Sequence, residues 1–185
     1  MTADKDLRFS FRPLTDDDLD MMHAWLNDPD VVRWWEGDDV SMPGVIATYS
    51  PTRRTPDSTE HWIAELDSQP VGWICSWPVT DGLEESEAWF PLGVEQTAAG
   101  IDYLVGGPDQ RGHGIGSAMI RSFTYSVVFG QHCGWTQAAA GPYTANVASC
   151  RALEKAGFKF LGSVQHEDDD EGPCSLMVMN RPAPR

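Results

Sequence analysis

Apolar residues recur along the chain at the spacings of strands and helices in alternation. Residues 8–13 predict an edge strand, and residues 16–26 predict a helix that Thr15 caps and whose first turn is acidic. The Asn27-Asp28-Pro29 sequence ends that helix. Residues 34–54 mix aromatic, acidic, glycine and proline positions, which predicts short helices and loops.

The rest of the chain continues the alternation. Residues 61–66 and 71–77 predict a hairpin. Residues 100–106 predict a strand with Asp102 and Leu104 on one face. Further segments predict helices at 114–129 and 146–156, the second capped at Gly157, and strands at 135–140, 159–164 and 175–179. We therefore expect one α/β domain over residues 1–185.

The composition of the chain indicates the compartment and the kinds of binding partner to expect. The four cysteines form no C-x-x-C pair, and neither a secretory signal nor an apolar segment of membrane-spanning length is found, so we expect a cytoplasmic protein without a metal site. A formal net charge of -15 opposes nucleic-acid binding and favours a cationic partner. The same charge is also compatible with a role in solubility alone.

A glycine-rich turn carries the first candidate chemistry. Residues 111–116 read Arg-Gly-His-Gly-Ile-Gly between a predicted strand and a predicted helix. Glycines let a phosphate approach the backbone at a helix N-terminus, and Arg111 would add a cation there. The turn matches neither a P-loop nor the dinucleotide-binding glycine pattern. Taken alone it is equally compatible with an ordinary glycine-rich loop.

Two later motifs support an anion-binding role for this turn. Asn146 and the Ala156-Gly157-Phe158 sequence follow one strand and one helix later. The set Arg-x-x-Gly-x-Gly, Asn and Ala-Gly-Phe resembles the GNAT superfamily of acetyl-CoA-dependent N-acetyltransferases. That resemblance implies a mixed, mostly antiparallel central sheet flanked by helices. It also implies direct acetyl transfer within a ternary complex.

The resemblance places acetyl-CoA, as a co-substrate, on specific residues. The pyrophosphate would lie on the turn, and the pantetheine arm along the strand and near Asn146, whose alternative role is a simple helix cap. The implied cofactor-binding residues are Tyr103, Leu104, Val105, Arg111, Gly112, His113, Gly114, Ile115, Gly116, Ser117 and Asn146.

Within the superfamily the chain is most similar to aminoglycoside 6′-N-acetyltransferases. The likeness rests on residues 25–35, which include Trp-Leu-Asn-Asp-Pro and Trp-Trp, on Gly100-Ile101-Asp102, and on the core at 111–158. Acyltransferases of siderophore precursors share the first stretch but have a histidine where this chain has Asp102. Asp102 is therefore the candidate general base for the acceptor amine, and a structural carboxylate is the alternative. A backbone amide near Val105 would stabilise the oxyanion, as in the superfamily.

The residue at the position where the family has its proton donor to the CoA thiolate differs in this chain. Relatives carry a tyrosine seven residues after the motif asparagine, where this chain has Leu153. Tyr125, Tyr143 and water remain alternatives.

Acidic and aromatic residues are candidates for binding a polycationic acceptor. The predicted substrate-binding residues are Trp34, Trp35, Glu84, Glu85, Glu87 and Asp168, with core packing or a solvated acidic face as the alternative for each. Two other functions stay open: acylation of a siderophore precursor or a protein N-terminus, and a non-catalytic acetyl-CoA-binding module. Monomer and homodimer are both compatible with the sequence.

Overall fold

A computed structural model describes residues 8–35, 37–82, 86–165 and 172–183. It confirms the predicted class, a mixed sheet of seven strands with flanking helices, in the order β1-β2-β3-β4-β5-β7-β6. The strands are β1 (Phe9–Pro13), β2 (Glu60–Leu66), β3 (Gln69–Pro78), β4 (Ala98–Val105), β5 (Gln137–Ala140), β6 (Lys159–Val164) and β7 (Cys174–Asn180). The helices are η1 (Asp16–Asp18), α1 (Leu19–Leu26), α2 (Pro29–Val32), α3 (Met42–Tyr49), η2 (Phe90–Leu92), η3 (Pro108–Gln110), α5 (Ile115–Phe123), η4 (Thr124–Val128), α6 (Phe129–Gln131) and α7 (Val147–Ala156).

The chain forms two compact units. Unit 1 comprises Met1–Cys75 and Tyr103–Ile115, and unit 2 comprises Ser76–Asp102 and Gly116–Arg185. Strands β3 and β4 each continue from one unit into the other. The extent of a single domain over residues 1–185 stays a prediction.

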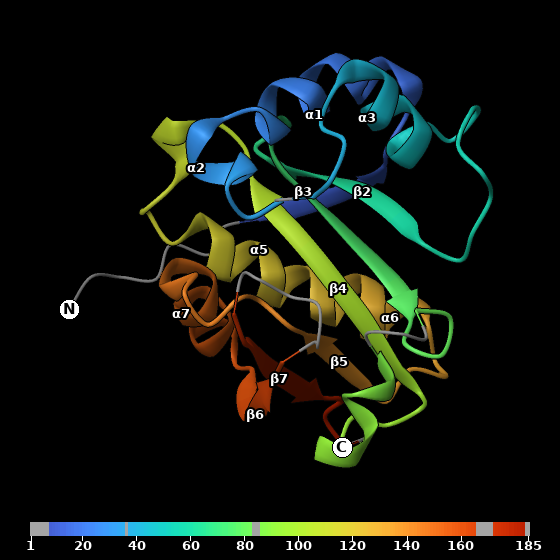
Figure 1. The fold of residues 1–185 in the computed structure, drawn as a ribbon, viewed down its shortest axis with the longest axis vertical. Coiled ribbons are helices and arrows are strands. Elements are labelled where there is room, and N and C mark those ends of the chain that lie inside the picture. Colours follow the sequence, from blue (N-terminus) through green and yellow to red (C-terminus); the bar gives the residue numbers. More distant parts are fainter. Residues whose placement is uncertain (1–7, 36, 83–85, 166–171, 184–185) are drawn as a thin grey trace. The chain divides into compact units, whose positions relative to one another are not determined.

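Unit 1 combines an antiparallel hairpin with three short helices. β1 pairs with β2 from Phe9 opposite Leu66 to Pro13 opposite Trp62. β2 and β3 are joined by Asp67 and Ser68, both with positive φ, which is the backbone of a tight two-residue hairpin turn. The helices α1, α2 and α3 gather together (Figure 1) and bury the apolar residues Met22, Leu26 and Val45.

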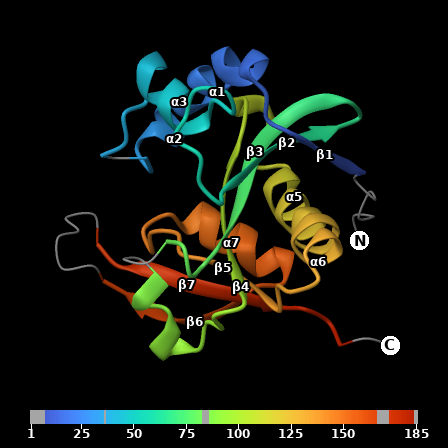
Figure 2. The same ribbon diagram turned by 90° about the vertical axis from the view of Figure 1, so that its right-hand side faces the viewer.

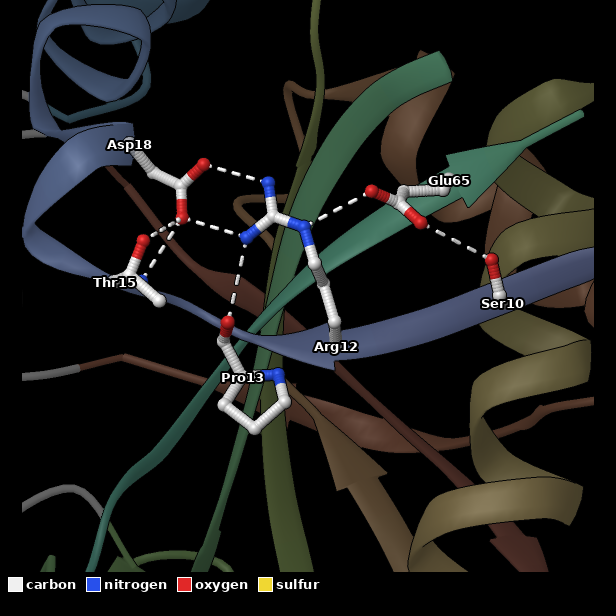
Figure 3. Close-up of polar contacts among 6 residues, drawn as sticks. All are labelled: Ser10, Arg12, Pro13, Thr15, Asp18 and Glu65. Carbon is white, nitrogen blue, oxygen red and sulfur yellow. Dashed lines mark hydrogen bonds and ion pairs between the residues drawn. The ribbon is translucent and has the colours of Figure 1, made fainter. Parts of the chain in front are cut away.

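A network centred on Arg12 fixes the start of unit 1 (Figure 3). The Arg12 guanidinium donates to both oxygens of Asp18, at 2.7 and 2.6 Å, and to Glu65 Oε1 at 2.9 Å. Asp18 also accepts from the backbone and hydroxyl of Thr15. Burial alone would raise the pKa of Asp18, but these hydrogen bonds outweigh it and lower that pKa. The acidic first turn is therefore a 3-10 turn held by Arg12, and the α-helix begins only at Leu19.

Buried aromatic rings surround His61 in unit 1. The ring of Tyr49 meets the rings of His61 and Trp73 edge-on, and the His61 ring stacks on that of Trp73 at a centroid distance of 5.7 Å. Burial, helped by the charge of Arg54, lowers the pKa of His61 to about 4. His61 is therefore neutral at physiological pH and belongs to the packing of the unit.

Unit 2 contains β5, β7 and β6, at one end of the strand order, together with the first part of β4. β4 runs parallel to β5, and β7 is antiparallel to both β5 and β6. Figure 2 shows β5, β7 and β6 side by side with α7 along them. One apolar cluster on this sheet includes Trp89, Leu176 and Val178.

The predicted helix over residues 114–129 is interrupted. α5 ends at Phe123, residues Thr124–Val128 form a π-helical turn, and α6 follows. The Thr124 hydroxyl donates to the Ile120 carbonyl and the Ser126 hydroxyl to the Ser122 carbonyl, which competes with regular helical bonding. Of the helices in the part of the chain that the structure describes, none has the length and apolar character needed to cross a membrane.

Candidate acetyl-CoA site

The glycine-rich turn follows β4 in unit 1. After Val105 the chain passes through η3 to Arg111 and reaches α5 at Ile115. Gly112 and Gly114 have φ values of +78° and +83°, a region that residues with a Cβ rarely adopt. Among the described residues other than each glycine and its chain neighbours, no heavy atom lies within 4 Å of a Cβ built on either glycine. The turn thus has the open, closely approachable backbone that a phosphate group needs at the start of a nine-residue helix.

Arg111 makes contacts that the sequence does not predict. Its Nη1 donates to Asp28 Oδ1 at 2.8 Å, its Nη2 to the Gly106 carbonyl at 2.6 Å, and its Nε to the Val105 carbonyl at 3.3 Å. Asp30 lies 3.6 Å from the same Nη1. The hydrogen bond from Arg111 lowers the pKa of Asp28, so the pair is ionic at neutral pH. Most of the N–H donors of the Arg111 guanidinium are therefore directed to partners within unit 1, where β4 ends.

Tryptophan rings pack on glycine backbone in both units. A Cβ on Gly106 would lie 2.7 Å from Trp25 Cε2, both within unit 1. In unit 2, a Cβ on Gly100 would lie 2.4 Å from Trp77 Cε2. Since these distances are too short for any side chain, the two glycines are required for the indole rings to lie against the strand. In the sequence, the Trp25 and Gly100 stretches signal only a family likeness and not these contacts.

Asp102 lies on β4 at the end of the first segment of unit 2. Its side chain is exposed, whereas the preceding Ile101 is 1% exposed. Tyr103 and Val105 are half-buried, and Leu104 is 4% exposed. Burial therefore does not alternate regularly along the strand, although a simple alternation was expected. The role of Asp102 as a base stays a prediction that its exposure permits.

Asn146 is the N-cap of α7 in unit 2. Its side-chain oxygen accepts from the Ser149 amide at 3.1 Å, and Gly157, with φ of +109°, closes the same helix. Asn146 thus has the helix-capping role that was its alternative. Its contact with the pantetheine arm stays a prediction. The backbone N–H of Asn146 also donates to the Tyr143 carbonyl at 2.8 Å.

The candidate proton donors differ in their surroundings. Leu153 is fully buried, so the position where relatives carry a tyrosine belongs to the core. Tyr143 is half-buried in the turn that leads into α7. Tyr125 is 41% exposed, and its ring lies under the Arg121 guanidinium at 5.1 Å. Tyr143 is thus the tyrosine that lies next to the motif asparagine, and proton donation by Tyr125, Tyr143 or water stays a prediction.

The structure describes only some of the predicted acceptor-binding residues. Glu84, Glu85 and Asp168 lie outside the described residues. Glu87 is exposed, and Trp34 and Trp35 are half-buried. The Arg33 guanidinium lies 4.9 Å from the centre of the Trp34 ring. Neither tryptophan is a fully buried core residue, so both retain surface on which a sugar could pack.

The chain is similar to known acetyltransferases in sequence and in fold. Residues 15–166 match the acetyltransferase (GNAT) domain family. The chain is 29% identical over 176 residues to aminoglycoside N(6')-acetyltransferase type 1 of Klebsiella pneumoniae, covering 94% of this chain and 84% of that protein. The crystal structure of AAC(6')-Ib with coenzyme A and kanamycin superposes with a TM-score of 0.79 at 28% identity, covering 94% of this chain and 95% of that one. An aminoglycoside N(6')-acetyltransferase from Legionella pneumophila, 22% identical with a TM-score of 0.71 over 97% of this chain and 95% of that one, shares the fold.

Proposed function

Because the chain belongs to the GNAT family of acetyltransferases, we propose that it transfers the acetyl group of acetyl-CoA to the 6′-amine of an aminoglycoside. One observation carries the choice of acceptor. Similarity to the aminoglycoside enzymes covers 94% of the chain and includes the segments before the cofactor motif. A cofactor-binding core alone would be shared with GNAT enzymes that act on any amine. Acetylation of this amine would make the protein an antibiotic-resistance enzyme.

The glycine-rich turn and the end of β4 supply the cofactor site in this proposal. Backbone amides from Gly112 to Ser117 bind the pyrophosphate at the positive end of α5. The open space at Gly112 and Gly114 supports this assignment. The pantetheine arm binds along Tyr103–Val105, and the bound thioester supplies an activated acetyl carbonyl.

Asp102 acts as the general base. The acceptor amine must lose a proton so that its lone pair can form the new C–N bond while the C–S bond breaks. An exposed carboxylate on β4 can take that proton directly or through one water, which is worth about 10²–10⁴-fold in rate. The CoA thiolate receives its proton from Tyr143 or from water.

The charge of the protein fits an acceptor with several ammonium groups. The formal net charge is -15, and Glu87 is exposed. Carboxylates bind ammonium groups through charge-assisted hydrogen bonds, and half-buried Trp34 and Trp35 provide rings for a sugar face. Acetylation of one amine would remove one of the positive charges that such a site recognises.

A panel of amines assayed for release of the CoA thiol tests this function. The panel holds aminoglycosides, a polyamine, a hydroxylated diamine of the kind used in siderophores, and a peptide with a free N-terminus. We expect rapid thiol release only with the aminoglycosides. A faster reaction with the hydroxylated diamine or the peptide would favour another acyltransferase, and cofactor binding without thiol release from any amine would favour a binding module.

A further inference from the structure

The connection between α1 and α2 has a fixed conformation of its own. Asn27 donates through its side chain to the carbonyls of His23 and Val40, at 2.9 and 2.8 Å. Asp28 then caps α2 by accepting from the Asp30 amide at 2.9 Å. The backbone of this connection is therefore held by hydrogen bonds to the end of α1, to the loop at Val40 and within α2.

Two side chains of this connection reach the end of β4 within unit 1. Asp28 pairs with Arg111 at 2.8 Å, and the side chains of the two residues are only 19% and 23% exposed. Asp30, which lies 3.6 Å from the same guanidinium, is 68% exposed. Trp25, one turn earlier, packs its indole on Gly106. The ion pair of Asp28 is thus the better shielded of the two and will be the stronger.

The contacts of Arg111 and Gly106 define the path of the chain into the glycine-rich turn. Arg111 donates to two successive carbonyls, those of Val105 and Gly106. The Gly106 amide donates to the Val71 carbonyl at 2.9 Å. Both backbone polar groups of Gly106 are therefore hydrogen-bonded, and the Trp25 ring packs against its Cα.

We propose that Asp28 is a positioning residue for acetyl-CoA: through Arg111 it holds the start of the glycine-rich turn in the shape that binds the pyrophosphate. This role rests on the proposed function. It changes the part that the sequence suggested for Arg111, which becomes an internal anchor while backbone amides bind the phosphates. It also gives the Trp-Leu-Asn-Asp-Pro segment a function in cofactor binding.

The direction of the effect separates positioning from simple electrostatics. Asp28 is a negative charge close to a site for a polyanion, so charge alone predicts tighter CoA binding when Asp28 is neutralised. Positioning predicts weaker binding, because an unpaired Arg111 no longer fixes the turn. A general loss of folding would weaken every ligand, whether or not it carries a pyrophosphate.

Asp28→Ser is the informative variant, with Asp30→Ser as its matched control. Serine keeps the cap on α2 but is too short to reach Arg111. The probes are CoA and acetyl-pantetheine, which lacks the pyrophosphate, and the measurement is the Kd of each by calorimetry. We expect Asp28→Ser to weaken CoA binding about tenfold, as for the loss of one charged hydrogen bond. The affinity for acetyl-pantetheine, and that of Asp30→Ser for CoA, should stay within about twofold.

The other outcomes overturn the proposal in distinguishable ways. Unchanged or tighter CoA binding by Asp28→Ser would show that the pair does not shape the turn. Equal losses for both ligands would assign Asp28 to general stability. In a double-mutant cycle, Arg111→Gln should add little to Asp28→Ser, and additive losses would contradict action through Arg111. Wild-type protein that bound neither probe would instead overturn the proposed function together with this role.

Discussion

Two charged side chains singled out by the sequence, one in each unit, differ in their surroundings. Arg111, in unit 1, directs its guanidinium to Asp28 and to the carbonyls of Val105 and Gly106. Asp102, in unit 2, stands exposed on β4 beside buried Ile101. The motif arginine is thus engaged by partners within unit 1, whereas the aspartate of unit 2 is exposed to solvent. Under the proposed role of Asp28, a charged residue in a binding motif need not be the group that contacts the charged ligand.

Asp102→Asn should have the largest effect on activity. Asparagine keeps the shape of the side chain but cannot accept the ammonium proton, so kcat should fall by about 10²-fold or more. The Kd of acetyl-CoA should change little. Steady-state kinetics with an aminoglycoside and calorimetry with acetyl-CoA measure the two effects.

The pH dependence of this variant distinguishes two roles for Asp102. Raising the pH supplies more free amine, which should partly rescue a missing base. If Asp102 only bound the ammonium group, the loss would appear in the acceptor KM and not in kcat, and it would be largest at a pH where the amine is protonated. Unchanged kcat and KM would leave Asp102 with neither role.

A third region, around Arg12, provides an ion pair whose loss should affect stability alone. Asp18→Ala leaves the Thr15 amide without its carboxylate acceptor and Arg12 with Glu65 as its remaining carboxylate partner, which should cost about 2–3 kcal/mol of unfolding free energy. Asp17→Ala, at the exposed neighbour, should change stability by less than about 0.5 kcal/mol. Chemical denaturation measures both. A change in the acetyl-CoA affinity of folded Asp18→Ala would mean that this network also shapes the site.

Gly114→Val should weaken acetyl-CoA binding about tenfold, because valine is strained at a φ of +83°. The fold should be retained, since no heavy atom lies within 4 Å of the new Cβ. Gly107→Val is the matched control, because Gly107 lies between β4 and η3 on the way to the turn, has equally open space and has an ordinary φ of -58°. Calorimetry on both variants is the measurement. Equal losses would mean that added bulk, rather than backbone conformation, is what the site rejects.

The smallest expected effect concerns the overall charge. Between about 0.1 and 1 M salt the Debye length falls from ~10 to ~3 Å, so long-range attraction of a polycation to this acidic protein is screened. We expect kcat/KM for an aminoglycoside to fall about threefold more than kcat/KM for a simple monoamine. Parallel salt slopes for the two acceptors would assign the charge to solubility.

Local signals in the sequence were sufficient for much of the fold. Asn146 and Gly157 define α7 at both ends because their capping preferences depend only on neighbouring residues. The helix after the glycine-rich turn was predicted without its π-helical turn, because Thr124 and Ser126 bond to the backbone in a way that apolar spacing does not reveal. The sequence does not predict α2 either, because Asn27-Asp28-Pro29 is a typical end of one helix, whereas Pro29 also begins the next.

The candidate site was predictable only where its residues share a motif. The turn at 111–117 could be recognised because glycine positions directly limit backbone conformation. The pair of Asp28 and Arg111 joins residues 83 positions apart, so it depends on the fold and leaves no local pattern. The same holds for Trp25 on Gly106, although an isolated glycine at the end of a strand signals a close approach.

The most direct test of the proposed reaction uses two aminoglycosides that differ only at the 6′ position, one with an amine and one with a hydroxyl. CoA thiol release and the mass of the product are measured with wild-type protein and acetyl-CoA. We predict stoichiometric thiol release and a single added acetyl group with the 6′-amine, and no reaction above background with the 6′-hydroxyl. Equal acetylation of both sugars, or of neither, would contradict the assignment of this chain as a 6′-N-acetyltransferase.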